Sequence, residues 1–313
     1  MQIVILSQGT PEWLAWRNGG IGSSDAMVIA AEAGMIPTKD WMGNIDELYL
    51  EKTGVLGPEK PNPLMERGHR LEPFARATYE RQTGEVVLPV CGTMDQDPMM
   101  RASFDGISFD GLSYLELKAP NADVHALARE GKVVDYYKPQ IAHQALVAWG
   151  PPKQWPERGV CRFGSYMPDD EKVPEKGELL RVSLPASAPR FREFAAALYA
   201  EEQKFLDALR TGVPPCGQPF ADGAKEWLDL KAKEKALKTQ IDAIEESLAK
   251  IVQSLNRKSL SGLGLTVAKQ ERKGAIDYAK ALAEYGIAET EVERYRKASS
   301  EHWAYRAKKA VLK

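Results

Sequence analysis

The sequence has few cysteines, and no part of it is long and apolar enough to cross a membrane. Its three cysteines, Cys91, Cys161 and Cys216, form no CxxC pair. We therefore expect neither a zinc or iron–sulfur cluster nor a disulfide framework, and we expect all three cysteines to be buried. Because no run of about 18 apolar residues and no low-complexity tract occurs, a membrane span and wholesale disorder are excluded. The N-terminus lacks the basic region of a signal peptide, so a cytoplasmic location is expected.

The sequence also lacks a clear excess of either charge. Its 42 basic and 44 acidic residues give a net charge of -2. This near balance hides an asymmetry, since residues 221–313 carry 19 basic and 14 acidic residues while residues 1–220 carry 23 and 30. The length of 313 residues allows one large core or a core with a smaller second domain. The opposite charge balances indicate that the chain has two regions of different electrostatic character.

A linker is predicted at residues 212–219, where five of eight residues are glycine or proline. We therefore expect a core domain over 1–213 and a C-terminal module over 220–313. Helical patterns are predicted at 10–17, 23–34, 43–54, 64–83, 134–149 and 188–210. Strand-like runs are predicted at 86–92, 101–108, 113–119, 158–166 and 178–184. This order indicates an α/β domain with a central mixed sheet.

Beyond the linker, leucine and isoleucine recur at spacings of three and four residues up to Leu255. This predicts a long amphipathic helix over 225–256, which could fold back on its own domain or join subunits. Residues 259–270 predict a turn and a strand, and short helices are predicted at 275–286 and 288–309.

Two carboxylates and a lysine stand out in the middle of the core. Two predicted strands joined by a glycine-containing turn carry Asp105 on the first and Glu116 and Lys118 on one face of the second. This donor set suits Mg²⁺ or Mn²⁺. Alternatively, the two Asp-Gly pairs form turns, and Glu116 and Lys118 lie on a solvated strand face. Leu115 and Leu117 favour the metal site over the solvated face, because they indicate a buried strand in which unpaired charges are costly.

The spacing Asp-Gly-x(9)-Glu-Leu-Lys from Asp105 to Lys118 resembles the (D/E)xK centre of restriction-endonuclease-like, RecB-type nucleases. Three further motifs occur in the expected order: W-x(3)-R-x(6)-S over 13–24, G-x(3)-E over 68–72 and Y-x-x-Q over 137–140. Together they cover residues 13–150. The chain thus resembles the YqaJ-type viral recombinase family, also called the phage lambda exonuclease family.

The resemblance implies a restriction-endonuclease-like core, in which helices flank a mixed sheet. The helices predicted beyond the linker add a mainly helical C-terminal extension. It implies a Mg²⁺-dependent 5′→3′ exonuclease, with Mn²⁺ as a substitute, that leaves 3′ single-stranded tails on duplex DNA for phage-type recombination. The implied partners are duplex DNA with 5′-phosphorylated ends, a single-strand annealing protein and other copies of the chain in a ring-shaped homotrimer. The implied setting is a phage or prophage protein in a bacterial cell.

The same resemblance assigns roles to individual residues. The implied catalytic residues are Asp105, Glu116, Lys118, Glu72 and Gln140. The implied metal ligands are Asp105, Glu116 and the backbone carbonyl of Leu117, with Lys118 positioning the attacking water. The implied pocket for the terminal 5′-phosphate consists of Arg17 and Ser24. Asp97 and Tyr137 are further candidates.

Each assignment has a plainer alternative. Glu72 could be a surface helix charge, Ser24 an ordinary helix N-cap, and Gln140 with Gln144 a polar helix face. His69 could ligate a metal, although a solvated histidine is the simpler interpretation. The basic segment 257–280 could add a duplex contact or be a solvated surface.

Two other functions stay open. One is a different nuclease of the superfamily, either endonucleolytic or CRISPR-associated with an iron–sulfur cluster; the lack of a four-cysteine cluster argues against the latter. The other is a non-catalytic module that binds DNA ends, against which the intact acidic and lysine residues argue.

Overall fold

The computed structural model describes residues 1–57, 62–269, 282–286 and 288. The chain divides into two compact units, Met1–Ala221 and Asp222–Lys313. The predicted linker lies where α7 (Pro189–Thr211) ends at Gly212 and α8 (Gln218–Ser254) begins. Gly212 adopts a left-handed conformation, with φ of 71°, that glycine tolerates and that ends the helix.

A six-stranded mixed sheet forms the centre of the first unit, as predicted. The strands lie in the order β1 (Gln2–Val4), β2 (Val87–Thr93), β3 (Arg101–Ser108), β4 (Ser113–Lys118), β5 (Val160–Pro168) and β6 (Gly177–Pro185). All neighbours are antiparallel except β4 and β5, which are parallel. The parallel pair needs a long crossover, which α5 (Ala122–Arg129) and α6 (Lys138–Trp149) supply.

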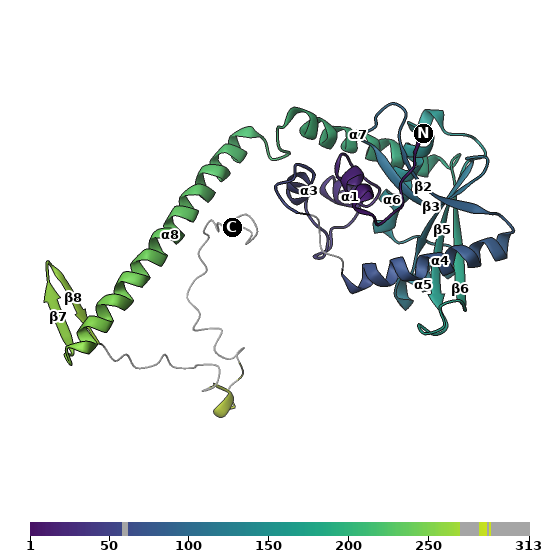
Figure 1. Cartoon of the computed structure of the whole chain (residues 1–313). Coiled ribbons are helices and arrows are strands. Elements are labelled where there is room, and N and C mark those ends of the chain that lie inside the picture. Colours follow the sequence, from purple (N-terminus) through teal and green to yellow (C-terminus); the bar gives the residue numbers. More distant parts are fainter. Residues whose placement is uncertain (58–61, 270–281, 287, 289–313) are drawn as a thin grey trace. The chain divides into compact units, whose positions relative to one another are not determined.

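Helices cover both faces of the sheet (Figure 1). On one face, α4 (Pro63–Thr83) packs its apolar side against β4, β5 and β6. On the other face, α6 packs with α2 (Asp25–Glu32) and α7 in the larger core cluster. Two further helices, α1 (Pro11–Asn18) and α3 (Ile45–Lys52), begin at Thr10 and Asn44, whose side chains accept hydrogen bonds from backbone amides of the first turn.

The predicted elements of the core agree with the structure, apart from two that were missed. One is β1, whose three residues pair with the end of β2. The other is α5, an eight-residue helix capped by Asn121. Strand β1 is too short for hydrophobic periodicity to reveal it, whereas α5 is as long as helices that were predicted.

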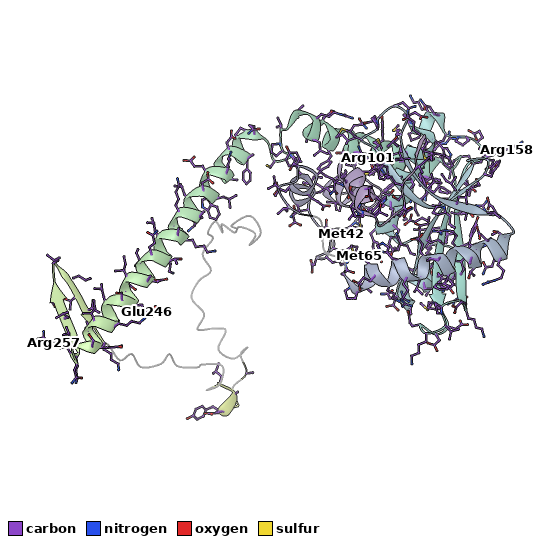
Figure 2. All side chains as sticks on the ribbon, viewed as in Figure 1. Met42, Met65, Arg101, Arg158, Glu246 and Arg257 are labelled. Carbon is purple, nitrogen blue, oxygen red and sulfur yellow. The ribbon has the colours of Figure 1, made fainter. Side chains whose placement is uncertain are left out.

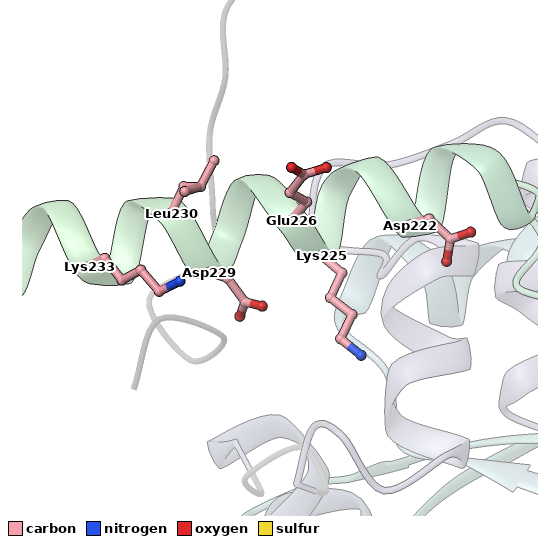
Figure 3. Close-up of a pocket in the computed structure, with 6 residues that line it drawn as sticks. All are labelled: Asp222, Lys225, Glu226, Asp229, Leu230 and Lys233. Atoms are coloured by element: carbon pink, nitrogen blue, oxygen red, sulfur yellow. The ribbon is translucent and has the colours of Figure 1, made fainter.

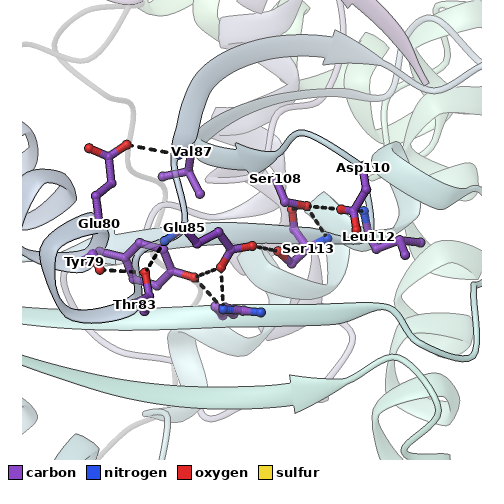
Figure 4. A network of polar contacts seen from close by, with 10 residues as sticks. Tyr79, Glu80, Thr83, Glu85, Val87, Ser108, Asp110, Leu112 and Ser113 are labelled. Atoms are coloured by element: carbon purple, nitrogen blue, oxygen red, sulfur yellow. Dashed lines mark hydrogen bonds and ion pairs between the residues drawn. The ribbon is translucent and has the colours of Figure 1, made fainter.

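A polar network connects α4 with β4 and β5 (Figure 4). Glu85 accepts hydrogen bonds from the hydroxyls of Tyr79 and Ser113 and pairs with Arg162 at 2.7 Å. Burial, together with the hydrogen bond to Glu85, raises the pKa of Tyr79 to about 12, so its hydroxyl remains a donor at neutral pH. Next to it, Asp110 forms the turn that joins β3 to β4.

The second unit contains the predicted long helix, α8, and a short hairpin of β7 (Ser259–Gly262) and β8 (Leu265–Ala268). The hairpin replaces the expected turn and single strand. Its turn residues, Leu263 and Gly264, both have positive φ, as a two-residue hairpin requires. The helices predicted at 275–286 and 288–309 lie largely outside the described residues. No described helix has the length and apolar character that a membrane span needs.

The cysteine prediction was right for Cys91 and Cys161, which are buried, and wrong for Cys216, which is exposed. Cys216 lies between α7 and α8 in the Gly/Pro-rich linker. All three are free thiols.

A shallow hollow in the second unit is lined by residues of a single helix (Figure 3). They are Asp222, Lys225, Glu226, Asp229, Leu230 and Lys233. Alternating charges at helical spacing are typical of a solvated surface. None of the residues predicted to be catalytic lines this hollow.

Candidate active site

Asp105 and Glu116 lie on neighbouring antiparallel strands. The β3–β4 register pairs Ile107 with Tyr114 and Gly106 with Leu115, and one further step brings Asp105 opposite Glu116. The ladder stops there, and Leu117 instead donates its backbone amide to Oδ2 of Asp105 at 2.6 Å. The Asp105 carboxylate thus takes the place of a backbone acceptor at the point where the strands separate.

Gly106 belongs to strand β3 and not to a turn. A Cβ atom at this position would lie 2.7 Å from Cγ2 of Val87 on β2, closer than a real contact allows. Glycine is therefore required for close strand packing beside Asp105. The alternative turn interpretation holds only for the second Asp-Gly pair, in which Gly111 has a φ of 68°.

Strand alternation separates the apolar and polar side chains of β4. Leu115 and Leu117 pack into the cluster with α4. Glu116 projects to the opposite face and is only 1% exposed. There Gln140 and Gln144 of α6 donate to its two oxygens at 2.6 Å and 2.5 Å. The predicted polar face of α6 therefore holds the Glu116 carboxylate in place.

Lys118 forms an ion pair with Oε1 of Glu116, and its Nζ lies 5.6 Å from the ring centre of Tyr137. Burial lowers the pKa of Lys118, but the charges of Glu116 and Asp105 outweigh burial and raise it above the usual value. Burial raises the pKa of Tyr137 to about 12. At neutral pH the site thus contains a lysine ammonium beside a neutral phenol.

Glu72 approaches from α4 and is paired with Arg76 one helical turn later. Arg76 also donates through Nε to the backbone carbonyl of Asp105 at 2.6 Å. Arg76 therefore connects Glu72 to the strand that carries Asp105. Sequence analysis missed Arg76, although its i,i+4 spacing from Glu72 was a usable signal.

The electrostatics of Asp105 favour a bound cation. Burial and the charges of Glu116 and Glu72 raise the pKa of Asp105 well above its usual value. A divalent cation between Asp105 and Glu116 would relieve this repulsion. Within the described part of the chain, no three acidic, histidine or cysteine side chains form a ready-made metal cage. Two carboxylates suffice for Mg²⁺, which usually retains several waters, so these residues fit Mg²⁺.

Two of the candidate residues do not join this cluster. Asp97 pairs with Arg210 of α7 at 2.5 Å and accepts from Gln203 at 3.3 Å. His69 is exposed on α4, in line with a solvated histidine.

Arg17 and Ser24 meet between α1 and α2. Arg17 donates to the hydroxyl of Ser24 at 2.7 Å and lies 5.5 Å from the ring centre of Trp13. Ser24 occupies the N-cap position of α2, but its side chain makes no capping hydrogen bond. Its hydroxyl, at the start of α2, can therefore bind an anion together with Arg17.

A buried ion pair that was not predicted from the sequence lies next to Arg17. The Lys52 side chain is 1% exposed, and its Nζ lies 2.6 Å from Oδ2 of Asp25. The same oxygen accepts from the backbone amide of Gly22 at 2.7 Å, and Arg17 lies 4.0 Å from the other oxygen. Burial raises the pKa of Asp25, but Lys52 and Arg17 outweigh it and hold the pKa below its usual value. Asp25 thus positions both cations.

Strand β3 connects the pocket with the acidic cluster. Trp13, which stacks on Arg17, donates through Nε1 to the hydroxyl of Ser103 at 2.8 Å. The carbonyl of Ser103 accepts from Gln144, which also holds Glu116. Ser103 lies two residues before Asp105. Strand β3 and Gln144 therefore connect Arg17 and Ser24 with the acidic residues.

Behind Gln140 and Gln144, α6 is fixed to α7 by a fully buried pair. Nδ1 of His143 lies 2.7 Å from Glu202, and Nε2 of His143 lies 2.9 Å from the carbonyl oxygen of Arg101. Burial lowers the pKa of His143, but Glu202 outweighs burial and raises it above the usual value.

Part of the chain is similar to known proteins. An alkaline exonuclease from Laribacter hongkongensis is 26% identical over 65% of this chain and 97% of its own, with a TM-score of 0.45. The structure of the same enzyme with dAMP gives 27% identity, the same coverage and a TM-score of 0.46. No curated protein matches the chain. The family model of the YqaJ-like viral recombinase domain matches residues 12–149, which include every residue of both groups described above except Glu202. The part of the chain that is similar to this family thus contains the candidate site.

Proposed function

We propose that this protein is a metal-dependent 5′→3′ exonuclease that degrades one strand of duplex DNA from its end. The observation that carries the proposal is the meeting of Asp105, Glu116 and Lys118 where β3 and β4 separate. Two carboxylates that can bind a metal and an ammonium group beside them suit phosphodiester hydrolysis.

In this proposal Asp105, Glu116 and the Leu117 carbonyl hold Mg²⁺. When bound, Mg²⁺ supplies an activated water and stabilises negative charge on the phosphate. Gln140 and Gln144 keep the Glu116 carboxylate oriented, and both lie on a rigid helix. Because these ligands are already oriented, no free energy is needed to order them during the reaction.

Lys118 is protonated at neutral pH, since its pKa lies above the usual value of 10.5. It therefore acts as a hydrogen-bond donor that orients the attacking water and stabilises the developing charge, and not as the initial base. Tyr137 keeps its proton as well and packs against Lys118, which limits the positions that the ammonium can adopt.

Arg17 and Ser24 are proposed to hold the terminal 5′-phosphate. Arginine offers a fork of donors to phosphate oxygens, and the start of α2 adds amide donors. An end bound in this pocket would present its strand to the acidic cluster, because β3 connects the two. This requirement for an end makes the proposed activity exonucleolytic.

The central experiment compares linear duplexes with 5′-phosphate or 5′-hydroxyl ends and a closed circular duplex, with Mg²⁺, Mn²⁺ or EDTA. We expect degradation of linear DNA only with metal, faster from 5′-phosphate ends, leaving 3′ single-stranded tails. Cleavage of circular DNA would instead indicate an endonuclease. End binding without hydrolysis in any metal would indicate a non-catalytic module.

The proposed partners follow from the same family resemblance. They are a ring-shaped homotrimer around the duplex and a single-strand annealing protein that receives the 3′ tail, in a phage or prophage system. The first 220 residues are net acidic, so positive charge must be concentrated along the duplex path.

Arg17→Ala is expected to remove the preference for 5′-phosphorylated ends. A charge-assisted hydrogen bond contributes about 1.5–3 kcal/mol, so the wild-type preference should be roughly 10- to 100-fold and should fall close to one. The measurement is the ratio of initial rates on the two ends. Arg190→Ala, at an exposed position of α7, is the matched control and should keep the ratio. A wild type without preference would show that the pocket assignment is wrong.

A further inference from the structure

An apolar stripe runs along α8 and is left open to solvent. Its members are Leu230, Leu237, Ile241, Ile244, Leu248, Ile251 and Leu255, the last just beyond the helix end. All except the half-buried Leu248 are between 46% and 59% exposed. Figure 2 shows side chains standing out around this helix, and Val252 is its one buried residue among those described. A stripe of this length in water is expected to be covered by a partner.

The spacing of the stripe defines the shape of that partner. After Leu237 the intervals alternate strictly between four and three residues, which is the repeat of a two-helix coiled coil. Leu237, Ile244 and Ile251 then occupy d positions, and Ile241 and Leu248 occupy a positions. We propose that α8 pairs with α8 of a second copy of this chain, in antiparallel orientation. This pairing does not depend on the nuclease activity.

A parallel pair is disfavoured by the charges of the helix. Glu234 occupies an a position, so a parallel in-register pair would bury it against Glu234 of the second copy. A parallel pair would also bring Lys233 next to Lys238 of the second copy. The repulsion between these two lysines would cancel the attraction between Glu226 of one copy and Lys231 of the other. In the antiparallel pair the two Glu234 side chains lie far apart, and each keeps its ion pair with Lys231 on its own helix.

The antiparallel pair brings together two charges that form no ion pair among the described residues. When Ile241 is aligned with Ile244 of the second copy, Lys238 comes to flank Glu245 of that copy, and the reverse pair forms by symmetry. Within the described chain, neither Lys238 nor Glu245 forms an ion pair, although neighbouring charges on α8 do. These two opposite charges therefore match this one register.

Engineered disulfides on the full-length protein test the register and the orientation. In a Cys216→Ser background, which removes the only exposed thiol in the described residues, chains with Leu237→Cys are mixed with chains carrying Leu248→Cys. These two positions face each other in the antiparallel pair, so a covalent dimer should form under oxidising conditions.

A single cysteine variant on its own distinguishes parallel from antiparallel pairing. Leu237→Cys alone should not cross-link, because its two copies lie about 16 Å apart along the helix axis, beyond the reach of a disulfide. Self-linking of Leu237→Cys would show a parallel pair and overturn the proposal. The absence of a covalent dimer in the mixture would also overturn it and would indicate that the chain covers its own stripe.

A charge swap provides an independent readout by sedimentation equilibrium. Lys238→Glu and Glu245→Lys should each weaken pairing about tenfold, because each places two like-charge pairs across the helices. The double variant, or a mixture of the two single variants, should restore pairing. Glu246→Lys, at an outward position on the same turn, is the matched control. Failure of the mixture to restore pairing would contradict the proposed register.

Discussion

Asp105→Asn is expected to reduce hydrolysis of linear duplex DNA to background, and Lys118→Met to lower its rate roughly 10²–10³-fold. Asp105 supplies one of the two carboxylates proposed to bind Mg²⁺, and an amide oxygen lacks the charge that makes this binding strong. Lys118 supplies the only ammonium paired with Glu116 among the described residues. The measurement is single-turnover cleavage, with duplex binding followed in parallel and expected to be unchanged.

Stability measurements separate a catalytic from a structural effect of Asp105→Asn. Without divalent metal, the variant should be at least as stable as the wild type, because it removes a carboxylate that is repelled by Glu116 and Glu72. Added Mg²⁺ should raise the Tm of the wild type but not that of the variant.

Two exposed positions provide matched controls for these variants. Asp207→Asn and Lys132→Met repeat the same chemical changes where the side chains are 70% and 66% exposed. Both should retain activity and Mg²⁺-dependent stabilisation. Turnover by Asp105→Asn, or a Tm of that variant that still rises with Mg²⁺, would rule out the carboxylate pair as the metal site.

Glu202→Gln is expected to lower the free energy of unfolding by roughly 3–5 kcal/mol, the usual cost of breaking a buried ion pair. Glu202 and His143 are both fully buried, and the second oxygen of Glu202 has no hydrogen-bond partner among the described residues. The carboxylate therefore depends on His143 alone. The measurement is chemical denaturation followed by tryptophan fluorescence.

The pH dependence of stability has a definite sign. The pKa of His143 is higher in the folded protein than its usual value of 6.5. The protonated histidine therefore contributes its full stabilisation below about pH 6.5. The contribution is lost as the pH rises through the folded-state pKa. In Glu202→Gln the fall in stability on the alkaline side should be smaller, because the charge that raises the pKa is gone.

Glu201→Gln on the neighbouring position of α7 is the control for this prediction. Its side chain is partly exposed and pairs with the exposed Lys204, so the change should alter stability by less than about 0.5 kcal/mol. Equal effects of the two substitutions would show that burial of the His143–Glu202 pair is not what stabilises the helices.

Local sequence patterns determined most of the secondary structure of the core. The periods of the apolar residues located its long helices and five of its six strands, because side chains that face a core repeat every 3.6 or 2 residues. The same period placed Gln140 and Gln144 on one face of α6, where both contact Glu116. The motif from Asp105 to Lys118 was readable because a hairpin brings near neighbours in sequence together.

Only the tertiary structure decided which distant polar groups pair. The Lys52–Asp25 ion pair, the His143–Glu202 pair 59 residues apart and the link from Arg76 to Asp105 all join separate elements. Asp97 likewise pairs with Arg210 of α7 instead of joining the acidic cluster. The spacing of polar residues does not show which distant group each one contacts, so these partners are set by the packing of helices against the sheet. The sequence by itself therefore determined the elements and the acidic motif, while tertiary packing decided how each charge is held.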